Sequence, residues 1–155
     1  MIFVTLGTQA FPFDRLLRGL DGLAEELVVQ GGASSHRPPG ADWFDYLEYP
    51  ELVEHVRRAR AVVSHAGVGS VMTAVAEGKR PLVVPRLHRF REAVDDHQVP
   101  FARRLAEAGL VTLVEDPAGL PAALADPPAL PDREASESKL AADLRSYLLD
   151  VTKTS

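Results

Sequence analysis

The chain has 155 residues, of which 46% are hydrophobic and 25% are charged, and its formal net charge is −5 at pH 7. This composition is typical of a globular domain, and the acidic balance argues against nucleic-acid binding through a basic surface. The absence of cysteine excludes disulfides, thiolate nucleophiles and cysteine-bound metals. We find no signal-peptide pattern and no apolar run near the roughly 20 residues that span a bilayer, so we expect a soluble cytoplasmic protein without a membrane span.

Short apolar runs alternate with helical patterns along the chain. Helical spacing of apolar residues predicts a first helix from Phe13 to about residue 27, despite glycines at 19 and 22, and further helices beginning near Pro50, Val71 and Gln98. A short helix at 117–124, a linker at 126–134 and an amphipathic helix at 135–150 follow, the last with leucines at 140, 144 and 148 on one face. Strands are expected at 2–6, 27–30, 61–63, 82–84 and 110–114, and a further strand is expected within 43–49.

This alternation predicts an α/β fold, a Rossmann-like parallel sheet of about six strands with helices on both faces. We expect one such domain at 1–125, with the final helix packed on it or on a partner. Ligands of such sheets bind beyond the carboxyl ends of the strands. Three loops fall on that edge, at residues 7–9, 64–70 and 86–98.

The loop at 64–70 reads Ser-His-Ala-Gly-Val-Gly-Ser and links a strand to a helix. Unpaired N–H groups and the positive end of the helix dipole at such a junction suit a phosphate. Gly67 and Gly69 let the backbone approach a ligand, and Ser70 is placed to cap the helix or to donate its hydroxyl to an anion. Neither G-x-x-x-x-G-K-[ST] nor G-x-G-x-x-G occurs, which argues against phosphate-loop and dinucleotide enzymes. The histidines show no metal-ligand spacing, so no metal site is predicted.

Each of these features also has a purely structural interpretation. A glycine-rich loop is often only a tight turn, and His65 alone fits a hydrogen-bonded structural histidine. Asp96 fits a helix cap and Gln98 a solvated surface position. The three arginines in 86–91 fit a solvated basic loop.

Four segments occur in an order typical of one enzyme family. They are M-I-F-V-T-L-G-T-Q at 1–9, S-H-A-G-V-G-S at 64–70, G-K-R-P-L-V-V-P-R at 78–86 and D-D-H-Q at 95–98. Together they resemble the donor-binding, C-terminal domain of GT-B glycosyltransferases of family 28, over about residues 1–114. Within that family the chain most resembles the small catalytic subunit of two-part bacterial exopolysaccharide glycosyltransferases. It is more distantly similar to the small subunit of the eukaryotic dolichol-linked UDP-N-acetylglucosamine transferase.

The resemblance implies roles for individual residues. Gly7 and Thr8 match a loop that approaches the donor diphosphate. Asp96 and Gln98, in a motif that includes His97, match a polar pair that reads hydroxyls of the transferred sugar. The loop that holds the nucleotide and diphosphate of a UDP-sugar is matched by His65, Gly67, Val68, Gly69 and Ser70.

Thr73 marks a departure from the family pattern, because many relatives have a glutamate there that contacts the ribose. The Thr73 hydroxyl can still hydrogen-bond to the ribose, but it is neutral and its side chain is shorter than that of glutamate. Glu77, one helical turn further on, could replace the missing glutamate only if the helix were shifted. Arg86 could join the N–H groups and His65 in stabilising the departing diphosphate without a metal.

The resemblance implies the catalytic, donor-binding subunit of an inverting, metal-independent glycosyltransferase. It would move a sugar from a UDP donor to a lipid-linked saccharide in polysaccharide biosynthesis, with His65 and Asp96 as candidate catalytic residues and no cofactor beyond the donor substrate. We find no convincing general base, so we expect a membrane-anchored, acceptor-binding partner subunit that completes a heterodimer at the inner face of the membrane. The alternative is a non-catalytic nucleotide-sugar-binding or scaffold subunit that activates a partner transferase.

Overall fold

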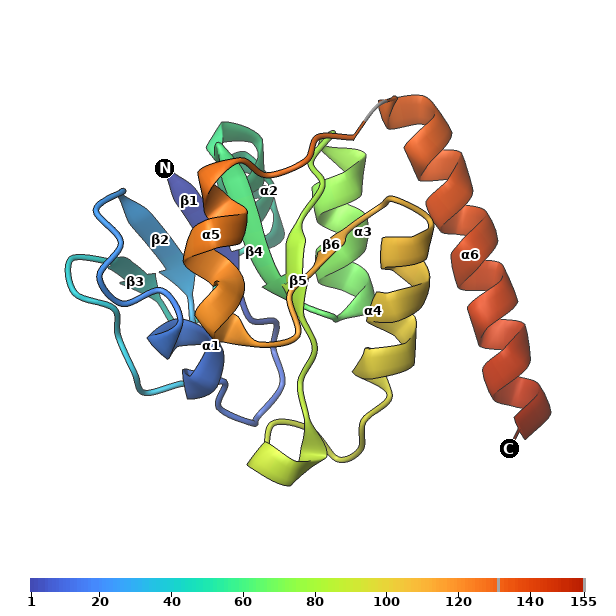
Figure 1. The fold of residues 1–155 in the computed structure, drawn as a ribbon, viewed down its shortest axis with the longest axis horizontal. Helices are drawn as coiled ribbons and strands as arrows, with labels where there is room; N and C mark the ends of the chain where they lie inside the picture. Colours follow the sequence, from blue (N-terminus) through green and yellow to red (C-terminus); the bar gives the residue numbers. More distant parts are fainter. Residues whose placement is uncertain (131, 155) are drawn as a thin grey trace.

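A computed structural model of the chain describes residues 1–130 and 132–154, with the backbone alone at 133 and 147–154. Its strands are β1 (Ile2–Thr5), β2 (Leu27–Gln30), β3 (Asp42–Phe44), β4 (Ala61–His65), β5 (Leu82–Val84) and β6 (Thr112–Leu113). Its helices are α1 (Asp14–Arg18), α2 (Tyr49–Arg58), α3 (Val68–Ala76), α4 (Gln98–Glu107), α5 (Leu120–Ala125) and α6 (Arg133–Thr154), with 3-10 turns η1 (His88–Phe90) and η2 (Pro117–Gly119) (Figure 1). The strands form one parallel sheet in the order β3-β2-β1-β4-β5-β6, which confirms the predicted Rossmann-like sheet.

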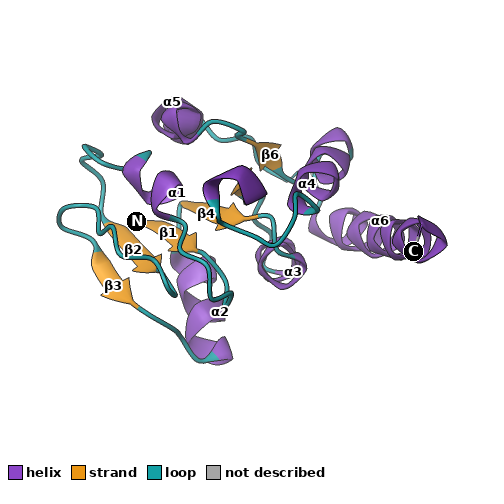
Figure 2. Cartoon of the chain, turned by 90° about the horizontal axis from the view of Figure 1, so that it is seen from below, coloured by secondary structure: helices purple, strands orange, loops and turns teal. Residues whose placement is uncertain are grey.

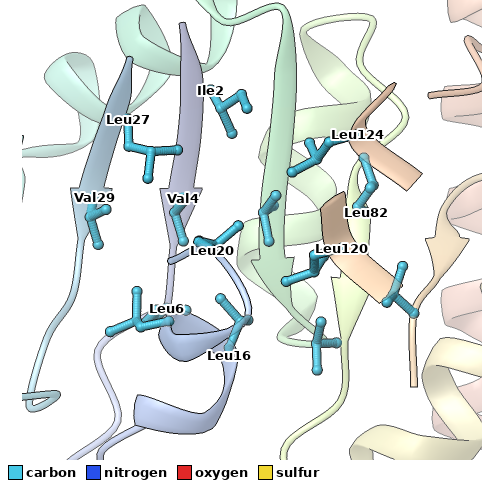
Figure 3. Packing of buried hydrophobic residues seen from close by; sticks show 14 of the residues in the cluster. Ile2, Val4, Leu6, Leu16, Leu20, Leu27, Val29, Leu82, Leu120 and Leu124 are labelled. Atoms are coloured by element: carbon cyan, nitrogen blue, oxygen red, sulfur yellow. The ribbon is translucent and has the colours of Figure 1, made fainter. Parts of the chain in front are cut away.

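Both faces of the sheet are covered, which explains why its central strands read as continuous apolar runs. Ile2, Val4 and Leu82 point to the face covered by α1 and α5, where they join the leucines of those helices (Figure 3). Phe3 and Val62 point to the opposite face and pack with residues of α2 and α3. Figure 2 shows these two helix layers on either side of the strands.

Helix α6 lies outside this sandwich, beside α4 (Figure 1). Leu140 is buried in a cluster with Val75 of α3 and Phe101 of α4, and Leu144 packs on the same cluster. The side chain of Leu148 lies outside the described residues. The helix begins two residues earlier than predicted because the Asp132 carboxylate accepts a hydrogen bond from Ala135 N (2.9 Å) and caps it. Within the described part of the chain, no helix has both the length and the apolar character that crossing a bilayer requires.

The first helix is much shorter than predicted. It ends at Arg18, and turns lead from there to β2. A Cβ at Gly19 would lie 2.5 Å from Pro117 O, so the close approach of η2 requires glycine at this position. Gly22 adopts the left-handed conformation (φ +85°). Leu20 is nevertheless buried, so the apolar spacing correctly marked core contacts but not a continuous helix.

The third strand, expected within 43–49, begins one residue earlier at Asp42 and ends at Phe44. The Asp45 carbonyl accepts hydrogen bonds from Gly32 N and from Gln30 Nε2 (both 2.9 Å), which directs the chain out of the sheet. Pro50 then lies in the first turn of α2, where its missing N–H costs nothing. As a result, Tyr46 and Tyr49 lie at the carboxyl edge of the sheet.

Candidate functional site

A cavity of about 370 Å³ opens at the carboxyl edge of the sheet, between the loops that follow β1 and β4. The chain continues from β1 to one side of the sheet and from β4 to the other, so this is the topological switch point at which α/β sheets bind ligands. The lining comes from the ends of β1, β2 and β4, the loops after β1, β3 and β4, and the first turns of α2 and α3: Thr5, Gly7, Thr8, Gln9, Gln30, Tyr46, Leu47, Tyr49, Leu52, His65, Gly67, Gly69, Ser70 and Thr73.

The amino terminus of α3 forms one wall of the cavity. Gly67 is its N-cap residue, without a side-chain cap, and the first hydrogen bond of the helix runs from Val71 N to Gly67 O. The N–H groups of residues 68–70 therefore have no partner within the helix and carry the positive end of its dipole. Ser70 lies inside the helix, so the suggested cap is wrong, and its hydroxyl lies at the cavity. This wall suits an anion.

His65 lies between two glycines at the base of the cavity. Its imidazole is 4% exposed, and its Nε2 lies 3.2 Å from Ser70 Oγ. A Cβ at Gly7 would lie 2.5 Å from His65 Nε2, and a Cβ at Gly67 would lie 2.3 Å from His65 Cε1. Gly7 also has a positive φ of 73°. These glycines are required because the histidine ring occupies the space of their missing side chains.

Acidification is expected to destabilise the protein through His65. Burial and the nearby Arg86 guanidinium lower the pKa of His65 to about 3, from an ordinary value of 6.5. Between these values the unfolded chain binds a proton that the folded chain does not, so the stabilisation is complete above pH 6.5 and is lost as the pH falls. From about pH 8 to about pH 5, His65 alone should lower the free energy of unfolding by about 2 kcal/mol.

Urea unfolding of the wild type and of His65→Gln at both pH values measures this effect. Other groups titrate in both proteins, so the difference between their pH dependences isolates His65. The variant should lose about 2 kcal/mol less than the wild type on acidification. An equal loss in both proteins would contradict the low pKa.

Gln30 is a cavity residue that was not predicted. It is buried at the end of β2, and its Oε1 accepts from Thr5 Oγ1 (2.9 Å) and Leu6 N (3.3 Å). Its Nε2 donates to Gly7 O (3.0 Å) and to Asp45 O. One side chain therefore joins the loops that follow β1 and β3. The sequence did contain a signal for Gln30, because it is a polar residue at the end of an apolar run, as His65 is.

Arg86 is not part of a solvated basic loop, and it does not line the cavity. It is 1% exposed, and its guanidinium donates to the carbonyls of Leu6 (2.6 Å), Phe11 (2.9 Å) and Glu92 (3.1 Å). The guanidinium group lies over the ring of Phe13, with its Cζ 4.9 Å from the ring centroid. Arg86 therefore joins the loops after β1 and β5 from behind the cavity.

The motif at 95–98 is brought only partly to the site. Asp96 lies outside the cavity, in a groove beside Arg89 and Arg103, and its carboxylate accepts from His88 N (2.8 Å). His97, not Asp96, is the N-cap residue of α4, so the helix-cap interpretation of Asp96 is wrong. The His97 side chain is exposed, makes no cap hydrogen bond and pairs with Asp95. Gln98 is 1% exposed, so the solvated-surface interpretation is wrong, and its amide is turned toward His65 rather than toward the cavity.

Thr73 lines the cavity, but its hydroxyl donates to Gly69 O (2.8 Å) one turn earlier. Glu77 is paired with Arg57 (3.2 Å) and is not among the lining residues, so the suggested compensation by Glu77 finds no support. Val68 is exposed at the start of α3. Tyr46 and Tyr49 supply aromatic surface, and they come from the interval in which the sequence predicted a third strand.

Solved structures show the class of fold. CalG4, the calicheamicin glycosyltransferase, has a TM-score of 0.57 at 20% identity, with 95% of this chain and 38% of that chain covered. The glycosyltransferase SnogD from Streptomyces nogalater has a TM-score of 0.59 at 19% identity, with 99% of this chain and 44% of that chain covered. The fold is therefore that of one Rossmann-like half of a GT-B glycosyltransferase.

Residues 1–149 match the Glycosyltransferase family 28 C-terminal domain, and the chain belongs to this family. The UDP-N-acetylglucosamine transferase subunit ALG13 of Yarrowia lipolytica is 39% identical over 62 residues, which are 40% of this chain and 29% of that protein. The UDP-N-acetylglucosamine--N-acetylmuramyl-(pentapeptide) pyrophosphoryl-undecaprenol N-acetylglucosamine transferase of Rhodospirillum rubrum is 31% identical over 129 residues, which are 81% of this chain and 32% of that protein. The chain thus spans a third or less of the length of these relatives.

Proposed function

We propose that this chain is the donor-binding, catalytic part of a glycosyltransferase that moves a sugar from a UDP-sugar to a lipid-linked saccharide. The observation that carries the proposal is the cavity at the switch point, where the amino terminus of α3, His65 and Ser70 converge. The names of the relatives in Yarrowia and Rhodospirillum support a UDP-N-acetylglucosamine donor and a polyprenyl pyrophosphate acceptor.

The chemistry of the cavity fits the departure of a diphosphate. As the sugar leaves, negative charge grows on the diphosphate oxygens, and preorganised N–H and O–H donors stabilise that charge. The free N–H groups of residues 68–70 and the hydroxyl of Ser70 supply such donors without a metal. The rings of Tyr46 and Tyr49 offer a flat surface on which the uracil ring of the nucleotide could stack. Inversion at the anomeric carbon is part of the proposal on the family resemblance alone.

The exposed apolar side chains support a partner that covers this edge. Among the described residues, every large hydrophobic side chain that is exposed lies at or after the carboxyl end of β3, β4 or β5: Phe44, Tyr46, Tyr49, Val68, Met72, Phe90 and Val94. Such a concentration of apolar surface is typical of an interaction site. We propose an acceptor-binding, membrane-anchored partner that completes a heterodimer there and brings the chain to the cytoplasmic face of the membrane for polysaccharide synthesis.

A non-catalytic, donor-binding subunit is the second candidate. It is favoured by the composition of the cavity wall, where none of the described lining residues is an aspartate or glutamate that could take the proton of an acceptor hydroxyl. In the catalytic version, the partner supplies that base.

Calorimetric titration of the full chain with UDP, with ADP and GDP as controls, tests the proposal. UDP should bind at least about tenfold more tightly than either control. His65→Ala should weaken UDP binding by about tenfold, since it removes one hydrogen bond to the diphosphate. His36→Ala is the matched control, because His36 lies outside the cavity and pairs with Asp21. Equal binding of the three nucleotides, or no binding of any, would overturn the donor assignment.

Sugar transfer separates the two candidates. The wild type or His65→Ala is incubated with labelled UDP-N-acetylglucosamine and with membranes that contain both the partner and the lipid acceptor. Label in the lipid fraction that depends on His65 supports the catalytic role. Transfer that is unchanged by a variant deficient in UDP binding would favour the non-catalytic subunit.

A further inference from the structure

Gln98 lies directly behind His65, at the first residue of α4. Its side chain is 1% exposed, and its Oε1 accepts two backbone hydrogen bonds, from Ala66 N (3.1 Å) and from Arg86 N (3.0 Å). These donors follow β4 and β5, so the amide joins the ends of two neighbouring strands to α4.

The two backbone donors determine which way the amide faces. A backbone N–H only donates, and only the carbonyl oxygen of the glutamine side chain accepts, so Oε1 must lie toward Ala66 and Arg86. The amide nitrogen then faces the other way, 3.3 Å from His65 Nδ1. It can only donate to that atom, and Nδ1 must therefore carry a lone pair rather than a proton.

A neutral imidazole with a free Nδ1 carries its proton on Nε2. Burial and the Arg86 guanidinium keep the pKa of His65 low, which favours the neutral ring. Nε2 is the nitrogen that lies 3.2 Å from Ser70 Oγ at the cavity. The ring thus directs its single N–H toward the cavity, where Ser70 Oγ is its acceptor within the protein. An oxygen of a bound diphosphate would take the place of Ser70 as that acceptor.

We propose that Gln98 is a positioning residue that sets the tautomer of His65, so that Nε2–H is presented to an oxygen of the bound diphosphate. The identity of this ligand rests on the proposed function, but the tautomer does not. His65 then acts as an uncharged hydrogen-bond donor. It cannot take a proton from an acceptor hydroxyl through Nε2, because that nitrogen is already protonated. Gln98 acts through His65 instead of reading the sugar.

The nitrogen NMR signals of His65 in the full chain test the tautomer at neutral pH, with His65→Ala to assign them. The wild type should show an unprotonated Nδ1 and a protonated Nε2. In Gln98→Glu, one carboxylate oxygen can still accept from Ala66 N and Arg86 N, while the other can only accept from the ring. A proton should therefore appear on Nδ1, which a merely structural glutamine would not cause.

Arg103→Gln is the matched control, because it makes the same change in net charge on an exposed part of α4 and should leave the His65 signals unchanged. A protonated Nδ1 in the wild type, or an unprotonated Nδ1 in Gln98→Glu, would overturn the proposal. A protonated Nδ1 in the wild type would overturn the proposal even if the variant did not fold.

Addition of UDP to the wild type separates this proposal from the proposed function. Binding should shift the Nε2 signal of His65 more than the Nδ1 signal. The expected tautomer without any shift on addition of UDP would leave the role of Gln98 standing and count against the donor site. A shift confined to Nδ1 would contradict the presentation of Nε2–H.

Discussion

Replacement of Arg86 by methionine is expected to lower the free energy of unfolding by at least about 3 kcal/mol, because three carbonyls lose their buried donor and each unpaired buried acceptor costs about 1–3 kcal/mol. Burial lowers the pKa of Arg86 to about 10, so the guanidinium is still charged at neutral pH. Methionine fills a similar volume but leaves the carbonyls of Leu6, Phe11 and Glu92 without their donor. Equilibrium unfolding in urea measures the loss.

The charge on Glu92 is not the cause of this loss. Its carboxylate keeps two hydrogen bonds from Arg15 (both 3.0 Å) and one from Leu87 N when Arg86 is removed. The cost therefore comes from buried carbonyls at the ends of the loops, each of which is expensive to leave unpaired. Because Leu6 precedes Gly7, UDP binding should weaken in the same variant.

Arg89→Met is the matched control for Arg86→Met. It removes the same charge from the same loop, but Arg89 is exposed, and its loss should change stability by no more than about 0.5 kcal/mol. Lysine at position 86 should recover only part of the stability, since an ammonium group does not reproduce the planar fork. Similar stabilities of the two methionine variants would show that the buried network contributes little.

Alanine in place of Gly67 is expected to destabilise the protein by about 1–3 kcal/mol, the usual cost of overpacking, and to weaken UDP binding by at least about tenfold. The new Cβ would lie 2.3 Å from Cε1 and 2.6 Å from Nε2 of His65. His65 is held from behind by Gln98, so the ring cannot move away without breaking that contact. Thermal or urea unfolding and calorimetry with UDP measure the two effects.

Gly69→Ala is the control for stability in this pair. A Cβ at Gly69 would meet no atom within 4 Å, and the residue lies in the first turn of α3. Alanine there should stabilise the helix by about 0.5–1 kcal/mol. If Gly67→Ala proved as stable as Gly69→Ala, the histidine ring would have to be free to move.

The overall fold could be predicted from short sequence patterns, because those patterns correspond directly to elements of the folded chain. The apolar runs of β2 and β5 were predicted at the correct residues, because a strand buried on both faces needs a continuous run. The first helix was predicted too long, since Leu20 and Leu23 pack on the core from turns. The spacing of apolar residues indicates which side chains are buried. The positions of Gly19 and Gly22 indicate better where the helix ends.

The position of the site was also predictable in part. Parallel strands end at one edge, so the loops after β1 and β4 had to lie near each other, and both line the cavity. Tyr46 and Tyr49 were missed because the sequence predicted a strand within 43–49 without showing that it ends at Phe44. Gln30 was missed because its four hydrogen bonds connect segments that the sequence does not show to be neighbours.

By itself, the sequence determined the parallel α/β architecture, the edge of the sheet at which the candidate cavity lies and the glycine loop that opens α3. These properties depend on residues close together in the chain and on the common direction of the strands. Only the tertiary structure decided which polar side chains face the cavity. Gln98 meets Ala66 across 32 positions and Arg86 meets Leu6 across 80, so both turn inward, while Asp96 stays on the outer loop. A buried polar group must find its hydrogen-bond partner, and where that partner comes from a distant segment, only the folded chain identifies it.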